Sequence, residues 1–130
     1  MSYTLDRKFT NASFDSVAER TREALAKQGF GVLTEIDVRA TLKKKLGVEM
    51  APYLILGACN PQMAHQALQL EPRLGAMLPC NVIVRQLESG VEVSAIDPVA
   101  SMSAVENSAL HEVAGTVRGM LSKAVSQISL

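Results

Sequence analysis

The chain has 130 residues, 48% of them hydrophobic, which suits a single domain that buries its own core. Thirteen basic and thirteen acidic residues give a formal net charge of zero, which argues against nucleic-acid or anionic-lipid partners because both attract basic surfaces. No apolar run is long enough to span a membrane, and the first residues are too polar for a secretory signal. We therefore expect one domain over residues 1–130, located in the cytoplasm.

The start of the chain predicts a strand followed by a long helix. Leu5 and Phe9 share one face of an extended segment, in the two-residue period of a half-buried strand. Apolar residues then follow helical spacing from Ser13, a suitable N-cap, to Gln28. Gly29 can take the left-handed conformation that ends such a helix. Both boundaries of this helix are therefore well defined.

The next segment predicts a strand with one solvated face and a short helical turn. Apolar Val32 and Ile36 alternate with acidic residues between positions 31 and 38, which indicates that the two apolar side chains share one face. Leu42 and Leu46 are four residues apart, the spacing of one helical turn. The three lysines between these two leucines are then expected to face water.

Residues 53–59 predict a central strand, because apolar side chains occupy both of its faces. Asn60 and Pro61 follow directly and suit the N-cap and first position of another helix. The Glu71-Pro72 step ends that helix, because the residue before a proline is restricted to extended backbone. A connection then leads to the last two strands.

Residues 80–85 and 91–96 predict a hairpin around a Glu-Ser-Gly turn. The clearest apolar stripe in the chain follows at 108–128 and predicts a long helix, with Asn107 or Ser108 as its cap. The order is strand, helix, four strands with short helical insertions, and helix. This order predicts an α+β fold with a mainly antiparallel five-stranded sheet and two long helices packed on one face.

Four segments also carry a specific pattern of residues. They are Gly-Phe-Gly-Val-Leu-Thr-Glu-Ile-Asp-Val at 29–38, Leu-Gly-Val at 46–48, Tyr-Leu-Ile-Leu-Gly-Ala-Cys-Asn-Pro at 53–61 and Leu-Pro-Cys-Asn-Val at 78–82. In this order they resemble the domain-of-unknown-function family 302 (DUF302). The resemblance implies a strand, helix, four-strand, helix fold in small prokaryotic proteins that can form homodimers, with no established activity. The residues of this chain that match the family pattern, and to which the resemblance assigns no role, are Glu35, Asp37, Cys59, Asn60, Pro61, Pro79, Cys80 and Asn81.

Cys59 and Cys80 suggest a ligand or thiol site. Cys59 ends a strand just before a helix N-terminus, where free N–H groups and the helix dipole stabilise a thiolate. Cys80 begins the next strand, so the two sulfurs approach each other if these strands are antiparallel neighbours. Asn60 and Asn81 follow the cysteines and would supply polar contacts. The alternative is that both thiols only fill space, since free cysteines are often buried.

A metal ion is one ligand that such a site suggests. Met63 and His65 follow Cys59, and Met77 precedes Cys80. Soft sulfur ligands favour Cu(I) or zinc, yet a closed zinc site needs four ligands, and the sequence lacks CxxC or HxxxH spacing. The metal is therefore unassigned, and we expect no cofactor.

Glu35 and Asp37 suggest a second polar site, with His65 as another candidate. The two carboxylates lie two residues apart on one face of a predicted strand, where they can act as acid and base or hold a hard cation. Alternating acidic residues also describe the wet face of a strand. His65 suits an exposed helix position equally well.

Three classes of function follow from these observations. The first is a binding module for a small ligand, a thiol or a soft metal ion, centred on Cys59 and Cys80. The alternative is a non-catalytic structural or interaction protein that forms a homodimer through the sheet face opposite the helices, since the central strand is apolar on both sides. An enzyme ranks last because no catalytic motif is present.

Overall fold

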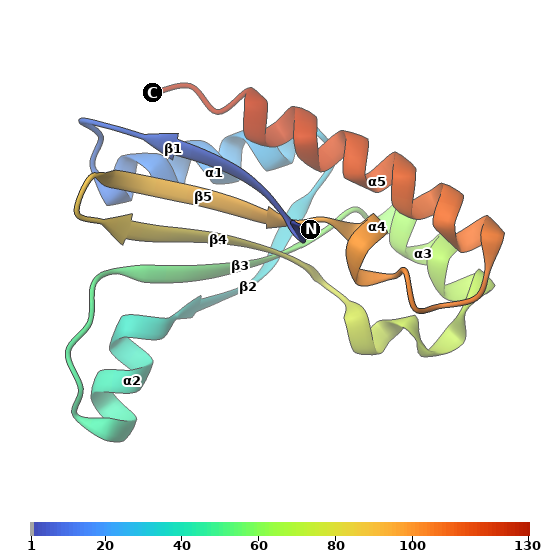
Figure 1. The fold of residues 1–130 in the computed structure, drawn as a ribbon, viewed down its shortest axis with the longest axis horizontal. Helices are drawn as coiled ribbons and strands as arrows, with labels where there is room; N and C mark the ends of the chain where they lie inside the picture. The colour runs from blue at the N-terminus through green and yellow to red at the C-terminus, as the bar shows by residue number, and fades with distance from the viewer. Residues whose placement is uncertain (1) are drawn as a thin grey trace.

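A computed structural model describes residues 2–130 as a sheet with two long helices on one face and shorter helices at its ends (Figure 1). Its elements are β1 (Thr4–Phe9), α1 (Phe14–Lys27), β2 (Gly31–Asp37), α2 (Val38–Leu46), β3 (Tyr53–Cys59), α3 (Pro61–Leu70), η1 (Pro72–Met77), β4 (Cys80–Leu87), β5 (Gly90–Ile96), α4 (Pro98–Ser101) and α5 (Ser108–Ser126). The strand order is β1-β5-β4-β3-β2, and every neighbouring pair is antiparallel. The predicted fold class is confirmed.

Local capping explains where the three longest helices begin. The side chains of Ser13, Asn60 and Asn107 each accept a hydrogen bond from the backbone N–H three residues further on. These bonds satisfy N–H groups that have no partner inside the helix. Asn107 is therefore the cap of α5, one of the two residues that the sequence offered. Beyond α1, Gly29 has a φ of +82° and takes the expected left-handed conformation.

The main core lies between the sheet and the helices α1 and α5, which contact each other. Val17 of α1 and Leu121 of α5 are fully enclosed, as are Leu56 and Val82 on the facing side of the sheet. Alternate residues of each strand reach this face, because side chains alternate along a strand. The two predicted helix stripes therefore bury against one apolar surface.

A smaller core lies where α3, η1 and α4 gather around the first turns of α5, at the right of Figure 1. Its buried members include Leu74, Met102 and Leu110. The sequence predicted only loops at η1 and α4. In α4 the Asp97-Pro98 step ends β5 and also starts the helix, since Oδ1 of Asp97 accepts hydrogen bonds from the next free N–H groups.

A bulge in β2 changes which of its residues share a face. Val32 pairs with Ala58, but Thr34 pairs with Gly57, so Leu33 is the extra residue. After the bulge Ile36 lies on the face opposite Val32, because one inserted residue reverses the alternation. The expectation that Val32 and Ile36 share a face is therefore wrong.

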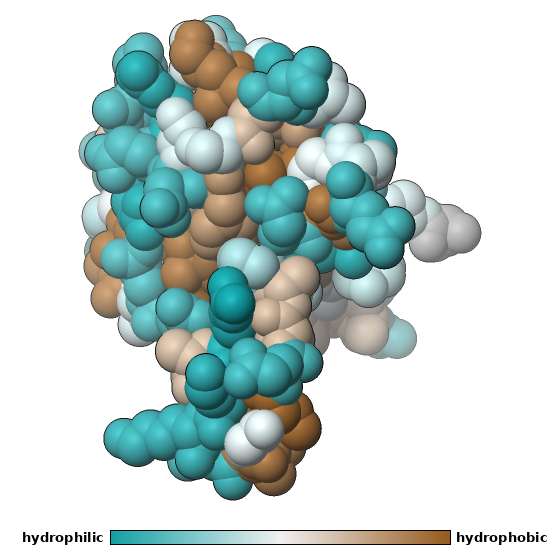
Figure 2. Space-filling model, turned by 90° about the vertical axis from the view of Figure 1, so that its left-hand side faces the viewer, coloured by the Kyte–Doolittle hydropathy of each residue, from teal (hydrophilic) through white to brown (hydrophobic). Residues whose placement is uncertain are grey.

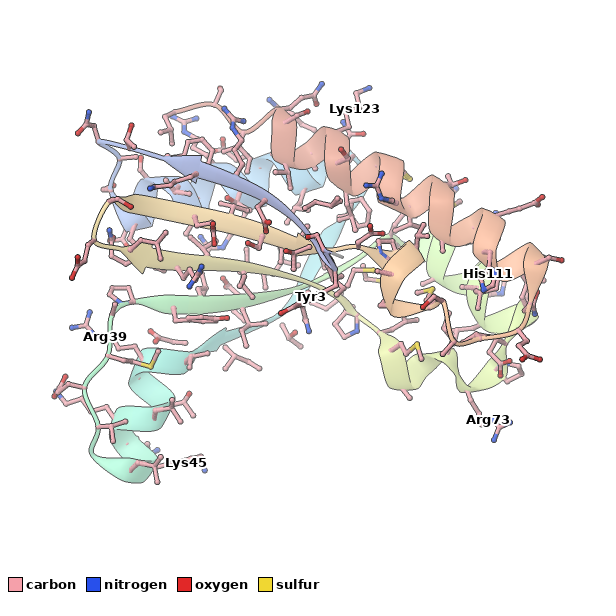
Figure 3. The ribbon with its side chains drawn as sticks, viewed as in Figure 1. Tyr3, Arg39, Lys45, Arg73, His111 and Lys123 are labelled. Carbon is pink, nitrogen blue, oxygen red and sulfur yellow. The ribbon has the colours of Figure 1, made fainter. Side chains whose placement is uncertain are left out.

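The helix α2 stands apart from the main core at the β2 edge. None of its residues is buried, and Val38, which the sequence assigned to the strand, begins it. Apolar side chains around this edge are exposed: Leu33 (67%), Ile36 (47%), Leu46 (70%) and Val48 (43%). Figure 2 shows apolar atoms over α2 beside polar ones at the bottom of the view, and Figure 3 shows Arg39 and Lys45 on the same helix.

The sheet face opposite α1 and α5 carries apolar side chains that are only partly buried, among them Tyr53, Ile55 and Ile83. This face and the α2 region both leave apolar side chains outside the two cores. None of the helices within residues 2–130 is both long and apolar enough to cross a membrane.

Candidate functional site

Cys59 and Cys80 line one pocket at the ends of β3 and β4. In the antiparallel ladder Cys80 pairs with Ala58, so the two cysteines lie at neighbouring positions on adjacent strands. The start of α3 forms one wall of the pocket, and Val113 and Val117 of α5 form another. The adjacency expected from the sequence is present, and both thiols are free.

Local sequence fixes the positions of both cysteines. Asn60 ends β3 after Cys59 and caps α3 through a hydrogen bond of 3.2 Å from the N–H of Met63 to Oδ1. Before Cys80, Pro79 packs on the backbone of Gly57, where an added Cβ would lie 2.8 Å from the proline ring. Gly57 is needed for this close approach.

The interior of the pocket is small and apolar. Its cavity volume is about 30 Å³, room for about two water-sized groups. Among residues 2–130, Asn60 is the only polar side chain besides the two thiols that lines it. Burial, with a smaller contribution from the neighbouring Cys59, raises the pKa of the Cys80 thiol to about 11. Cys80 is therefore a neutral thiol at pH 7, whereas Cys59 is partly exposed.

Two methionines bring further sulfur atoms to the pocket. Met63 lines it from the first turn of α3, and Met102 lines it from the end of α4. The sequence pointed to Met63 but not to Met102, because Met102 reaches the pocket only through the tertiary packing of α4 against α5. Met77, the other methionine considered, lies outside this pocket and is 42% exposed.

The remaining predicted members of the cysteine site lie elsewhere. Asn81 pairs with Gly57 and is exposed. It lines a separate, more open hollow of about 320 Å³ together with Met77 and Ile96. His65 is exposed on α3 and does not line the cysteine pocket. Of the four predicted residues, the structure therefore gathers Cys59, Cys80 and Asn60 but not Asn81.

Glu35 and Asp37 share a face of β2, and each already has a structural partner. Glu35 accepts a hydrogen bond of 2.9 Å from Nε of Arg22 on α1. Asp37 caps α2, accepting a bond of 2.9 Å from the N–H of Ala40. Within residues 2–130 no group of three or more His, Cys, Asp and Glu side chains is placed to hold a metal ion. A conventional zinc site therefore has no ligand set in this part of the chain.

The fold and pocket define a small α+β domain with an open antiparallel sheet. Residues 6–128 match the family described as domain of unknown function DUF302, and the chain belongs to that family. It is also similar to the crystal structure of an uncharacterized conserved DUF302 protein from Bacillus stearothermophilus, with a TM-score of 0.91 and 26% identity over 99% of this chain and 100% of that chain. No curated protein matches. The family establishes the fold and brings no activity.

Proposed function

We propose that this protein is a binding module whose pocket takes a small ligand through the sulfur atoms of Cys59 and Cys80. The observation that carries the proposal is that two thiols, distant in sequence, line one otherwise apolar pocket. Simple core packing explains a buried cysteine, but it does not require a partly exposed second thiol in the same cavity. A soft donor pair in an apolar setting suits a ligand that bonds to sulfur.

The two thiols differ in a way that suits entry and retention of a ligand. Cys59 is partly exposed at the junction of β3 and α3, whereas Cys80 is only 8% exposed. A ligand would therefore meet Cys59 first and Cys80 second. Because the cavity is small, the bound part of the ligand is a single ion or a group of few atoms.

The test is the rate at which iodoacetamide alkylates the folded, reduced protein. We expect one fast alkylation, at Cys59, which Cys59→Ser removes and Cys80→Ser leaves in place. Ala64→Leu enlarges a side chain that lines the pocket, so it should slow this reaction. Gln66→Leu on the exposed side of the same helix is the matched control. Equal rates in wild type and Ala64→Leu, or no alkylation before unfolding, would remove the proposal.

We propose self-association as a second function, favoured by the exposed apolar side chains around α2 and β2. A nine-residue helix with no buried residue gains little stability alone, and a second copy covering it would supply the missing packing. Light scattering should report the mass of two chains. Leu46→Glu should shift it to one chain, whereas Lys44→Glu on the same helix should not. A wild-type mass of one chain at micromolar concentration would exclude this function.

We also propose that the protein works in the cytoplasm. The two unpaired thiols support this location, because cysteines stay reduced there. Trapping the cellular thiols with a membrane-permeable alkylating agent before lysis should recover both cysteines in the reduced form. Recovery of a disulfide would argue for an oxidising compartment.

A further inference from the structure

We infer that the ligand of the cysteine pocket is Cu(I), bound by the sulfurs of Cys59 and Cys80 with the thioethers of Met63 and Met102 beside them. The inference rests on the proposed function and names the ligand class of that same site. Four sulfur-bearing side chains, from β3, α3, β4 and the end of α4, line one small cavity.

The donor set selects a soft ion. No carboxylate or imidazole among residues 2–130 lines the pocket, and its one oxygen-bearing side chain, Asn60, already accepts a hydrogen bond in its role as helix cap. Hard cations such as Mg²⁺ and Ca²⁺ need several oxygen ligands. Thiolate and thioether sulfurs instead favour Cu(I).

The size of the cavity favours an ion over an organic molecule. A volume of about 30 Å³ compares with about 300 Å³ or more for pockets that hold drug-sized ligands. A single metal ion is small enough for this volume. An organic ligand would have to displace α3 or α5, whose packing forms part of both cores.

The pocket also has a feature that stabilises the net charge of a bound copper ion. Binding breaks two S–H bonds, forms two Cu–S bonds and releases two protons to water, so a Cu⁺ ion with two thiolates carries one net negative charge. The thioethers add none. The N-terminus of α3, a helix of ten residues, begins two positions after Cys59, and its positive end stabilises a nearby negative charge. Because protons are released, copper affinity should rise with pH.

The experiment is an anaerobic titration of the full reduced chain against Cu(I) held by bathocuproine disulfonate. We expect the wild type to remove one copper ion per chain from the coloured complex. Cys59→Ser and Cys80→Ser should each lose this transfer. Met63→Leu and Met102→Leu should bind at least about tenfold more weakly, whereas Met77→Leu, outside the pocket, should match the wild type. X-ray absorption at the copper edge should show sulfur ligands only.

A wild type that takes no copper from the chelator would overturn the inference. The inference would also be overturned if both cysteine variants took up copper as fully as the wild type does. An equal loss of copper affinity in Met77→Leu and Met102→Leu would overturn it as well. Thermal melts of each variant separate loss of ligand from loss of fold, and the partly exposed Cys59 makes Cys59→Ser the safest variant in this respect. If alkylation depends on the pocket as proposed but copper transfer fails, only the identity of the ligand is wrong. If alkylation fails as well, the binding module itself is wrong.

Discussion

Cys80 of β4 lies directly across the ladder from Ala58, and it shares a pocket with Cys59, the next residue of β3. Burial in this apolar pocket raises the pKa of Cys80 to about 11 from a reference of 9.0, with Cys59 adding to the effect. The folded protein therefore holds the Cys80 proton more tightly than the unfolded chain does. This difference links stability to pH.

The Cys80 thiol should make the protein less stable in alkaline solution. Because the folded protein has the higher pKa, the protonated Cys80 thiol adds to the free energy of unfolding at pH values below the unfolded pKa of about 9. This contribution is lost as the pH rises from about 9 to about 11. The loss is at most about 3 kcal/mol. Urea unfolding at several pH values should show it in the wild type and in Cys59→Ala, but not in Cys80→Ala. The same alkaline loss in Cys80→Ala would contradict the assignment.

Arg7 ties the end of α5 to the first strand. Its Nη1 donates hydrogen bonds to the carbonyl oxygens of Val125 (3.0 Å), Ser126 (2.9 Å) and Ile128 (2.8 Å). These carbonyls lie at or beyond the last turn of the helix, where carbonyl groups run out of N–H donors from a following turn. That of Val125 also accepts a long bond of 3.4 Å from the N–H of Ile128. We predict that Arg7→Met, which keeps the length of the side chain, lowers the free energy of unfolding by about 2 kcal/mol.

Lys8→Met is the matched control, because Lys8 is exposed and lies on the other face of β1. Its unfolding free energy should stay within about 0.5 kcal/mol of the wild type. Equal losses in the two variants, measured by urea unfolding, would mean that the carbonyl contacts of Arg7 are not the cause.

The buried faces of the long helices are tested by charge insertion. Val17 is fully buried and Val117 is 8% exposed in the layer between α1, α5 and the sheet. Val17→Asp or Val117→Asp places an unpaired charge there and should cost several kcal/mol, about enough to unfold a marginal domain. Thr116→Asp on the exposed side of α5 should melt near the wild-type temperature. Native-like melting of either core variant would refute the assigned faces.

Asp97 links α4 to α5 and should make stability fall in acid. Burial alone would raise the pKa of Asp97, but hydrogen bonds from Arg118 and from the N–H groups of Val99 and Ala100 outweigh it and lower the pKa. The ionised Asp97 side chain therefore adds to the free energy of unfolding at pH values above the unfolded pKa of about 3.9. This contribution is lost as the pH falls below that value.

The Arg118 side chain is 46% exposed, so solvent screens the pair and we expect an acid effect of no more than about 1 kcal/mol. Asp97→Asn keeps a cap for α4 and removes the charge. The free energy of unfolding of both proteins is measured at neutral and at acid pH. Between these two conditions it should fall more in the wild type than in Asp97→Asn. An identical acid loss in both proteins would assign the effect to other carboxylates.

The sequence was sufficient wherever local chemistry decides the structure. Asn60 and Pro61 marked the start of α3, so the end of β3 and the position of Cys59 followed from them. In β4 the buried residues Cys80, Val82 and Val84 alternate with more exposed ones. The same alternation sends Asn81 to the opposite face, because adjacent residues of a strand point in opposite directions. This alternation does not apply to Asn60, because β3 ends at Cys59 and Asn60 is the N-cap of α3.

Two features had no local signal. Leu33 is an extra residue between two strand-favouring neighbours, Val32 and Thr34, so nothing in the local sequence marks the bulge or the exchange of faces after it. Met102 enters the pocket only because α4 folds back against α5. Such contacts between distant segments depend on tertiary packing, which periodicity and capping do not describe.

Whether Cys59 and Cys80 together hold a ligand is tested most directly by native mass spectrometry. The protein is purified without oxygen and then supplied with Cu(I) and a competing chelator. We predict that each wild-type chain carries the mass of one bound ion with two protons lost. The double variant Cys59→Ser/Cys80→Ser should appear only at the mass of the bare chain. A wild type that stays bare, or the same added mass on the double variant, would contradict a ligand held by these two sulfurs.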